Sequence, residues 1–170
     1  MSMTALIAAN TNARKKAASS GTNPWLSSQF YWLKKLATNP RGDAAREMSE
    51  LMLSSFGYQI RVGPLAQSFI VNGHTVKVKL CMAWSGSKSL KFQQIEQDAY
   101  THLLLLGLEP KDAWFWLSPQ AVSWANAGGQ HRQESRWIQF SVNRAPKWLA
   151  QYGGTIAKAQ ATCLAQLGSP

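Results

Sequence analysis

The sequence has 170 residues, 45% of them hydrophobic and 11% aromatic, which is typical of one globular domain with a real core. Eighteen Lys and Arg residues against eight Asp and Glu give a net charge of +10, which favours a polyanionic partner such as DNA or RNA. The chain has no run of about 18 apolar residues, which argues against a membrane-spanning helix. Its two cysteines, Cys81 and Cys163, predict free thiols in a reducing compartment.

Residues 1–22 are rich in Ala, Ser, Thr and Asn and contain Arg14-Lys15-Lys16. They predict a basic, flexible N-terminal arm, which either follows a DNA backbone or serves as a solubilising tail. Residues 23–170 are expected to form a single domain.

The predicted elements follow from hydrophobic periodicity and from Gly and Pro punctuation. Helices are predicted at 24–36, 43–56, 90–100, 119–127, 146–152 and 155–167. Strands are predicted at 58–62, 69–71, 76–81, 103–106, 113–117 and 137–142. Residues 39–42 predict a turn, 128–132 a flexible basic loop, and 153–154 a break between the last two helices. This order indicates an α/β fold whose mixed central sheet is flanked by helices and contains an antiparallel hairpin, then a helical crossover to a buried strand.

The hairpin at the centre of the chain has the clearest local signal. Asn72-Gly73 is typical of a type I′ turn, because both central positions of that turn need a positive φ. After it, apolar residues alternate with Lys77 and Lys79, so the two lysines are expected on the same face of a strand. Acidic residues are missing between Glu50 and Glu96. A hairpin that presents two lysines without carboxylates favours a phosphate or nucleic-acid site.

Three short motifs follow one another in register: Lys77-Val78-Lys79, Phe92-Gln93-Gln94-Ile95 and Gly129-Gln130-His131. With the helical acid Glu47 before them, they resemble the PD-(D/E)XK superfamily of restriction-endonuclease-like nucleases over residues 42–165. The resemblance implies a restriction-endonuclease-like fold, Mg²⁺-dependent hydrolysis of phosphodiester bonds in double-stranded DNA, a two-fold homodimer, and a cytoplasmic location in a prokaryote or phage.

Carried over by resemblance, Glu47 corresponds to the helical acid and metal ligand, and Lys79 to the motif lysine. Separately, Gln93 and Gln94 are candidates either to orient water or to read adenine. The metal-binding Asp falls at Ser68 and the metal-binding Glu at Lys77. A lysine at that position repels a divalent cation, so the Mg²⁺ site is expected to be impaired. Three explanations stay open: a DNA-binding protein that does not cleave, an inactivated form of an active nuclease, or a metal ligand that has migrated to Glu96.

Further residues are candidates for contact with DNA. They are Lys91, Gln93, Gln130, His131, Arg132 and Arg136. Glutamine suits the edge of adenine and arginine that of guanine. The alternative is that these are polar surface residues of a helix and a loop. The sequence therefore predicts a DNA-binding protein of the restriction-type family with impaired chemistry. The rivals are a non-enzymatic nucleic-acid-binding module or regulator and, more weakly, an RNA-binding protein.

Overall fold

A computed structural model describes residues 23–83, 88–130 and 133–170, and its centre is a six-stranded mixed sheet. The order across the sheet is β1 (Ile60–Val62), β2 (Ser68–Val71), β3 (His74–Met82), β5 (His102–Leu108), β6 (Ala113–Pro119) and β9 (Gly153–Thr155). β3 and β5 run parallel, and every other neighbouring pair runs antiparallel. The predicted N-terminal arm lies outside the described residues.

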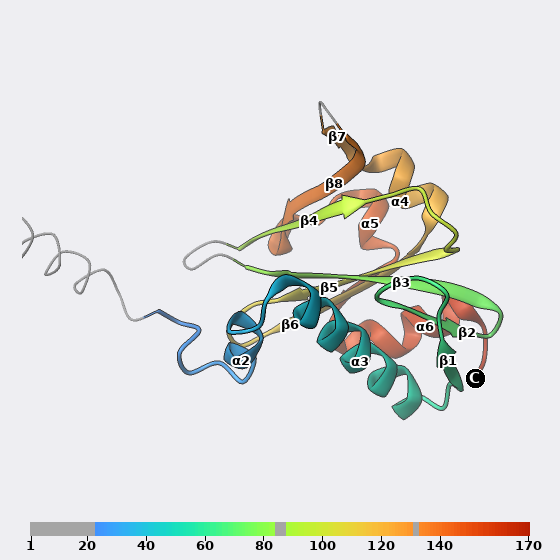
Figure 1. The fold of residues 1–170 in the computed structure, drawn as a ribbon, viewed down its shortest axis with the longest axis horizontal. Coiled ribbons are helices and arrows are strands. Elements are labelled where there is room, and N and C mark those ends of the chain that lie inside the picture. The colour runs from blue at the N-terminus through green and yellow to red at the C-terminus, as the bar shows by residue number, and fades with distance from the viewer. Residues whose placement is uncertain (1–22, 84–87, 131–132) are drawn as a thin grey trace, which may run out of the picture.

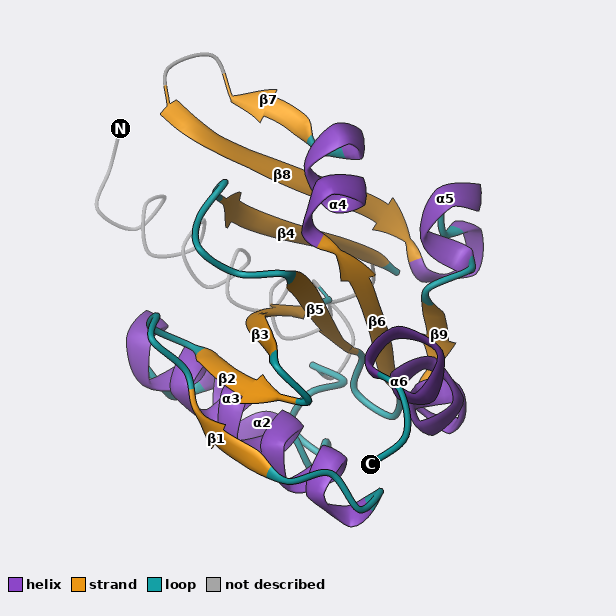
Figure 2. Cartoon of the chain, turned by 90° about the vertical axis from the view of Figure 1, so that its right-hand side faces the viewer, coloured by secondary structure: helices purple, strands orange, loops and turns teal. Residues whose placement is uncertain are grey.

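A smaller antiparallel sheet lies over one face of the first, in the order β4 (Ser89–Ile95), β8 (Gln133–Ser141), β7 (Gly128–Gln130) (Figure 1). The opposite face is covered by α3 (Thr38–Ser55) and α6 (Ala159–Leu167), as Figures 1 and 2 show. The remaining helices are α2 (Tyr31–Lys34), α4 (Gln120–Asn126) and α5 (Lys147–Ala150), with 3-10 turns at Val142–Arg144 and Ile156–Lys158. In the described part of the chain, no helix has the length and apolar character needed to cross a membrane.

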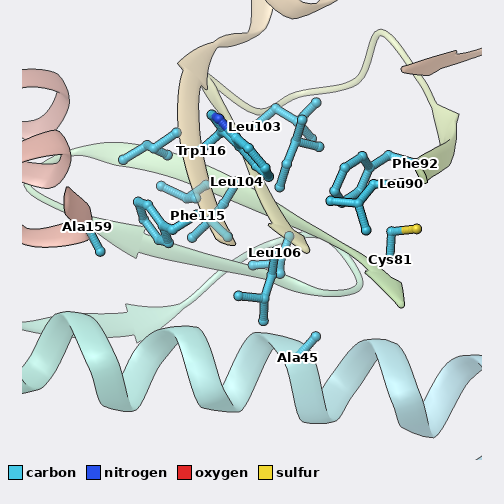
Figure 3. Packing of buried hydrophobic residues seen from close by; sticks show 14 of the residues in the cluster. Ala45, Cys81, Leu90, Phe92, Leu103, Leu104, Leu106, Phe115, Trp116 and Ala159 are labelled. Atoms are coloured by element: carbon cyan, nitrogen blue, oxygen red, sulfur yellow. The ribbon is translucent and has the colours of Figure 1, made fainter. Parts of the chain in front are cut away.

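The core forms on both faces of β5, which is buried along its whole length. On one face, Leu106 points toward Ala45 of α3 (Figure 3). On the other, Phe140 of β8 packs edge to face on Trp116, with ring centroids 5.0 Å apart, and stacks on Phe92 at 6.2 Å. Each fully buried Leu or Phe side chain contributes about 1.5–3 kcal/mol, so this core joins the two sheets.

Gly107 sets how closely the two sheets approach. A Cβ atom at this position of β5 would lie 2.4 Å from Cδ1 of Leu90 in β4. Because no side chain projects there, Leu90 packs directly against the backbone of the central sheet. The small sheet is therefore held close to β5, and β4 lies beside β3.

Several predictions from local sequence are confirmed. Asn72 and Gly73 have φ values of +48° and +79°, and join β2 to β3 as a hairpin. Val76 and Val78 are buried, whereas Lys77 and Lys79 are half-buried on the other face of β3. The run 103–106 is the buried centre of the main sheet. Both cysteines are free and buried.

The prediction of a helix at 90–100 is wrong, because residues 89–95 form strand β4. Leu90 and Phe92 follow the period of a strand, but Phe92 and Ile95 are three residues apart, a spacing that also fits a helix. The helical crossover between β3 and β5 is therefore replaced by a strand of the small sheet.

Other boundaries also differ from the predictions. Residues 39–42 are part of the first turns of α3, where Pro40 is tolerated because N–H groups there have no helical partner. The predicted helix at 24–36 is reduced to turns and the four residues of α2. The pair Gly153-Gly154 belongs to edge strand β9 rather than to a break between helices, and residues 128–130 form β7 rather than a loop.

Two histidine rings meet at the end of the central sheet that lies beside the hairpin turn. His74 begins β3 and His102 begins β5, and their ring centroids lie 4.7 Å apart, edge to face. His102 is only 8% exposed. Burial, and secondarily the neighbouring His74, lowers the pKa of His102 from 6.5 to about 4. The folded chain therefore holds this ring neutral under mildly acidic conditions.

Between pH 6.5 and about 4, the unfolded chain binds a proton at His102 that the folded chain does not. The free energy of unfolding should therefore fall as the pH is lowered through this window. Above pH 6.5, His102 is neutral in both the folded and the unfolded chain and should not affect stability in this way. We expect a His102→Gln variant to lose this part of the pH dependence in urea unfolding. An unchanged slope in the variant would contradict a buried, neutral His102.

Candidate nucleic-acid interface

A cleft of about 320 Å³ opens where the N-terminal end of α3 meets β3 and β4. Three cations and four amides line it: Arg41, Lys79, Lys91, Asn39, Gln67, Gln93 and Gln94. Within the described residues, no carboxylate belongs to its lining. The cleft therefore combines positive charge with hydrogen-bonding amides, which is the chemistry that phosphate groups and base edges require.

Lys79 projects from β3 into this cleft and is half-buried. Burial lowers the pKa of its ammonium group from the ordinary 10.5, and the positive charge of Lys77 lowers it further. The carboxylate of Glu96 acts in the opposite direction and only partly offsets these effects. An anion bound in the cleft would stabilise the charged form of Lys79.

Lys91 faces Lys79 from β4. Its backbone N–H donates to Sγ of Cys81 at 3.1 Å, which ties β4 to the end of β3. Its ammonium lies 5.4 Å from the ring centroid of Trp137, a cation–π contact that fixes the side chain beside the cleft. β3 and β4 each therefore place one lysine at the same opening.

Arg41 provides the third positive charge and also has a structural role. Its Nε donates to the carbonyl of Leu33 at 2.9 Å, and Nη2 donates to that of Leu36 at 2.6 Å. These bonds satisfy carbonyls at the C-terminal end of α2. The guanidinium is thus held at one rim of the cleft by α2 and α3 together.

The two glutamines of β4 face outward because the strand contains a β-bulge. Phe92 pairs with Ile138 and Ile95 with Arg136, so Gln93 and Gln94 lie opposite the single residue Trp137. In a regular strand, consecutive side chains point to opposite faces. Here both glutamines are exposed and line the cleft, while Phe92 and Ile95 on either side are buried. Such bulges redirect side chains and are frequent next to active sites.

Backbone strain is concentrated at the same place. Among described residues other than glycine, only Gln67, Asn72 and Gln94 have a positive φ. Asn72 is in the hairpin turn, whereas Gln67 (φ +50°) and Gln94 (φ +54°) both line the cleft. A left-handed conformation costs about 1–2 kcal/mol for such a residue and persists where the surroundings impose it. Strain of this kind is typical of functional sites.

The two positions that correspond by resemblance to metal-binding carboxylates are neighbours across the hairpin, since Ser68 pairs with Lys77. Neither is free to bind a cation. Oγ of Ser68 donates to the carbonyl of Leu65 at 2.7 Å and accepts from its N–H at 3.0 Å. Nζ of Lys77 donates to the carbonyl of Ala66. These residues do not fit Mg²⁺, which prefers several oxygen ligands of negative charge.

The predicted acids are separated in space. Glu47 is exposed, and its position on α3 is about 200° around the helix from the buried Ala45, so it lies on the outer face. Glu96 is exposed just after β4 and acts electrostatically on Lys79. The described residues contain no cluster of three or more His, Cys, Asp or Glu side chains suited to a metal.

The remaining predicted contacts lie in the small sheet. Arg136 stacks over Trp124 with 4.0 Å between its guanidinium carbon and the ring centroid, and its Nη1 donates to the Trp124 carbonyl at 2.7 Å. This side chain is engaged in holding α4 to β8. The backbone of Gln130 belongs to β7. His131 and Arg132 lie outside the described residues.

Three lining residues of the cleft, Arg41, Asn39 and Gln67, are not among the site residues predicted from the sequence. The positive charge of Arg41 was visible, but the carbonyls that orient it become neighbours only after folding. Nothing in the sequence indicates the left-handed conformation of Gln67. Comparisons with protein-family models, with curated proteins and with solved structures find no match to the chain.

Replacing Gln94 by glycine should stabilise the protein, because glycine adopts a positive φ without steric cost. We expect the free energy of unfolding in urea to rise by about 0.5–1 kcal/mol in Gln94→Gly. The matched control is Gln93→Gly, at the neighbouring exposed position whose φ is not positive, which should lose a similar amount. Equal losses in both variants would contradict strain at Gln94.

Proposed function

We propose that this protein binds double-stranded DNA through the cationic cleft and does not cleave it. The observation that carries the proposal is the convergence of Arg41, Lys79 and Lys91 on one opening without a described carboxylate in its lining. The net charge of +10 agrees with a polyanionic partner. A phosphate group in this cleft would neutralise charges that otherwise repel one another.

The fold is proposed to be restriction-endonuclease-like. Support comes from the order of α3 and the β2–β3 hairpin, with the three signature positions close together on that hairpin. Ser68 lies directly opposite Lys77, and Lys79 follows two residues later on the same face of β3. The parent chemistry implied by the resemblance is hydrolysis of a phosphodiester bond. The two-fold dimer and the cytoplasmic location implied by the same resemblance stay predictions.

The proposed lack of cleavage is explained by the bonds of Ser68 and Lys77, the two residues that stand where the resembling family has carboxylates. The hydroxyl of Ser68 is used within the turn at Leu65, and the ammonium of Lys77 is bonded to the backbone. A divalent cation between them would face Lys77 and Lys79 at close range, and Coulomb repulsion would oppose its binding. The site is thus better suited to an anion than to a metal ion.

Binding should depend on the two lysines that line the cleft from β3 and β4. We expect a Lys79→Ala/Lys91→Ala variant to bind a fluorescein-labelled duplex at least about tenfold more weakly in anisotropy titrations. The slope of log K against log salt should also shrink by about 0.9 for each phosphate contact that is lost. Lys111→Ala, an exposed lysine outside the cleft, is the matched control and should bind as the unaltered chain does. Equal affinity of the double variant would refute the cleft as the DNA site.

Restoring the two carboxylates tests the link to nuclease chemistry. In Ser68→Asp/Lys77→Glu, two carboxylates would occupy paired positions beside Lys79, and we expect Mg²⁺-dependent nicking of supercoiled plasmid to appear. Retained DNA binding without nicking would instead favour a binding module on a nuclease-like fold. Nicking by the unaltered chain in Mg²⁺ or Mn²⁺, abolished by Glu96→Gln, would show that a carboxylate has migrated and that the non-cleaving proposal is wrong.

A further inference from the structure

The bulge in β4 presents two amide side chains that have no function in the fold. Gln93 and Gln94 are both exposed, and neither amide side chain forms a hydrogen bond with another described residue. By contrast, the third glutamine of the cleft, Gln67, donates from Nε2 to Oδ1 of Asp43 at 3.1 Å. The two amides that β4 contributes to the cleft wall are therefore free to bond a ligand.

Two lysines of the cleft, Lys91 and Lys79, accompany these amides. Lys91 precedes them on β4 and is held against Trp137, and Lys79 lies across the cleft on β3. Lysines of this kind contact phosphates and fix the position of a duplex, but they do not distinguish one base pair from another. Neutral amides between them are suited to the second task, because they hydrogen-bond base edges without adding charge.

Strain at Gln94 is a second, independent indication. A bulge with a left-handed residue costs free energy that a regular strand would avoid, and glycine or asparagine would adopt the same φ with less strain. The geometric consequence of the bulge is that both glutamines line the cleft, whereas a regular strand would direct only one of them there. Strain at a functional site persists where it places a group for use.

We infer that Gln93 and Gln94 recognise the edge of an adenine in the major groove of DNA held by Lys79 and Lys91. An amide side chain offers one donor and one acceptor side by side, which matches N7 and the N6 amino group of adenine. Guanine presents two acceptors, cytosine only a donor and thymine only an acceptor in that groove. β4 is an edge strand of the three-stranded sheet β4–β8–β7, so the two bulged glutamines lie at a free sheet edge that can approach the major groove.

This inference rests on the proposed DNA binding, and its test separates the two. The preferred sequence of the full chain is first selected from duplexes with a randomised core. Affinities are then measured for that duplex and for an unselected duplex, in the unaltered chain and in Gln93→Ala, Gln94→Gly and the combined variant. Glycine at position 94 keeps the positive φ, so the backbone of the bulge is preserved. The matched control is Gln97→Ala, an exposed glutamine outside the cleft.

We expect the selected motif to contain an A·T pair, and we expect the combined variant to bind the selected and the unselected duplex equally well, within about twofold. Replacing that adenine by its analogue with C–H at position 7 should weaken binding to the unaltered chain by about 5- to 150-fold. The inference is overturned if the chain binds DNA without an A·T preference, or if the preference survives in the combined variant. If the chain binds neither duplex, the proposed function fails and base recognition fails with it.

Discussion

The half-buried positive charge of Lys79, with Lys77 beside it on the same strand, is the constraint on which the rest of this site depends. Burial lowers the pKa of Lys79, and Lys77, on the same face of β3 roughly 7 Å away along the strand, lowers it further. Among the described residues, Glu96 offsets these effects on Lys79 in part. A divalent metal would add a third positive charge, whereas a phosphate group would neutralise the existing ones. The charge balance therefore favours an anionic partner.

The position of the polar groups follows from apolar packing. Leu90 lies against the backbone at Gly107, which brings the small sheet close to β5. Phe92 and Ile95 are both buried although they are three residues apart, and the strand can bury both only by forming a bulge between them. The bulge then leaves Gln93 and Gln94 exposed in the cleft that Lys79 also lines. The core thus determines which side chains line the cleft.

The sequence alone was sufficient to predict those structural features whose signal is local. The Asn72-Gly73 turn, the alternation around Lys77 and the buried run 103–106 depend on neighbouring residues, and the structure confirms them. Strand β4 was mistaken for a helix because the spacing of Phe92 and Ile95 in a bulge is also the spacing of a helical face.

Other features depend on partners distant in sequence. The glycine pair at 153–154 is a strand only because it pairs with β6. Arg41 reaches the cleft rim because carbonyls of α2 hold its guanidinium there. Of the residues chosen from sequence, Lys79, Lys91, Gln93 and Gln94 come together in one cleft. Glu47 lies on the outer face of α3, Arg136 is engaged with Trp124, and neither lines it.

The central claim is that a phosphate of DNA stabilises the charged form of Lys79, which burial and the neighbouring Lys77 both disfavour. The most direct measurement is the pKa of the Lys79 ammonium, followed by NMR of isotopically labelled lysine side chains with and without a duplex. In the free protein this pKa should lie below the usual 10.5, and it should rise when the duplex binds. A pKa of Lys79 that is the same with and without bound DNA would contradict the account.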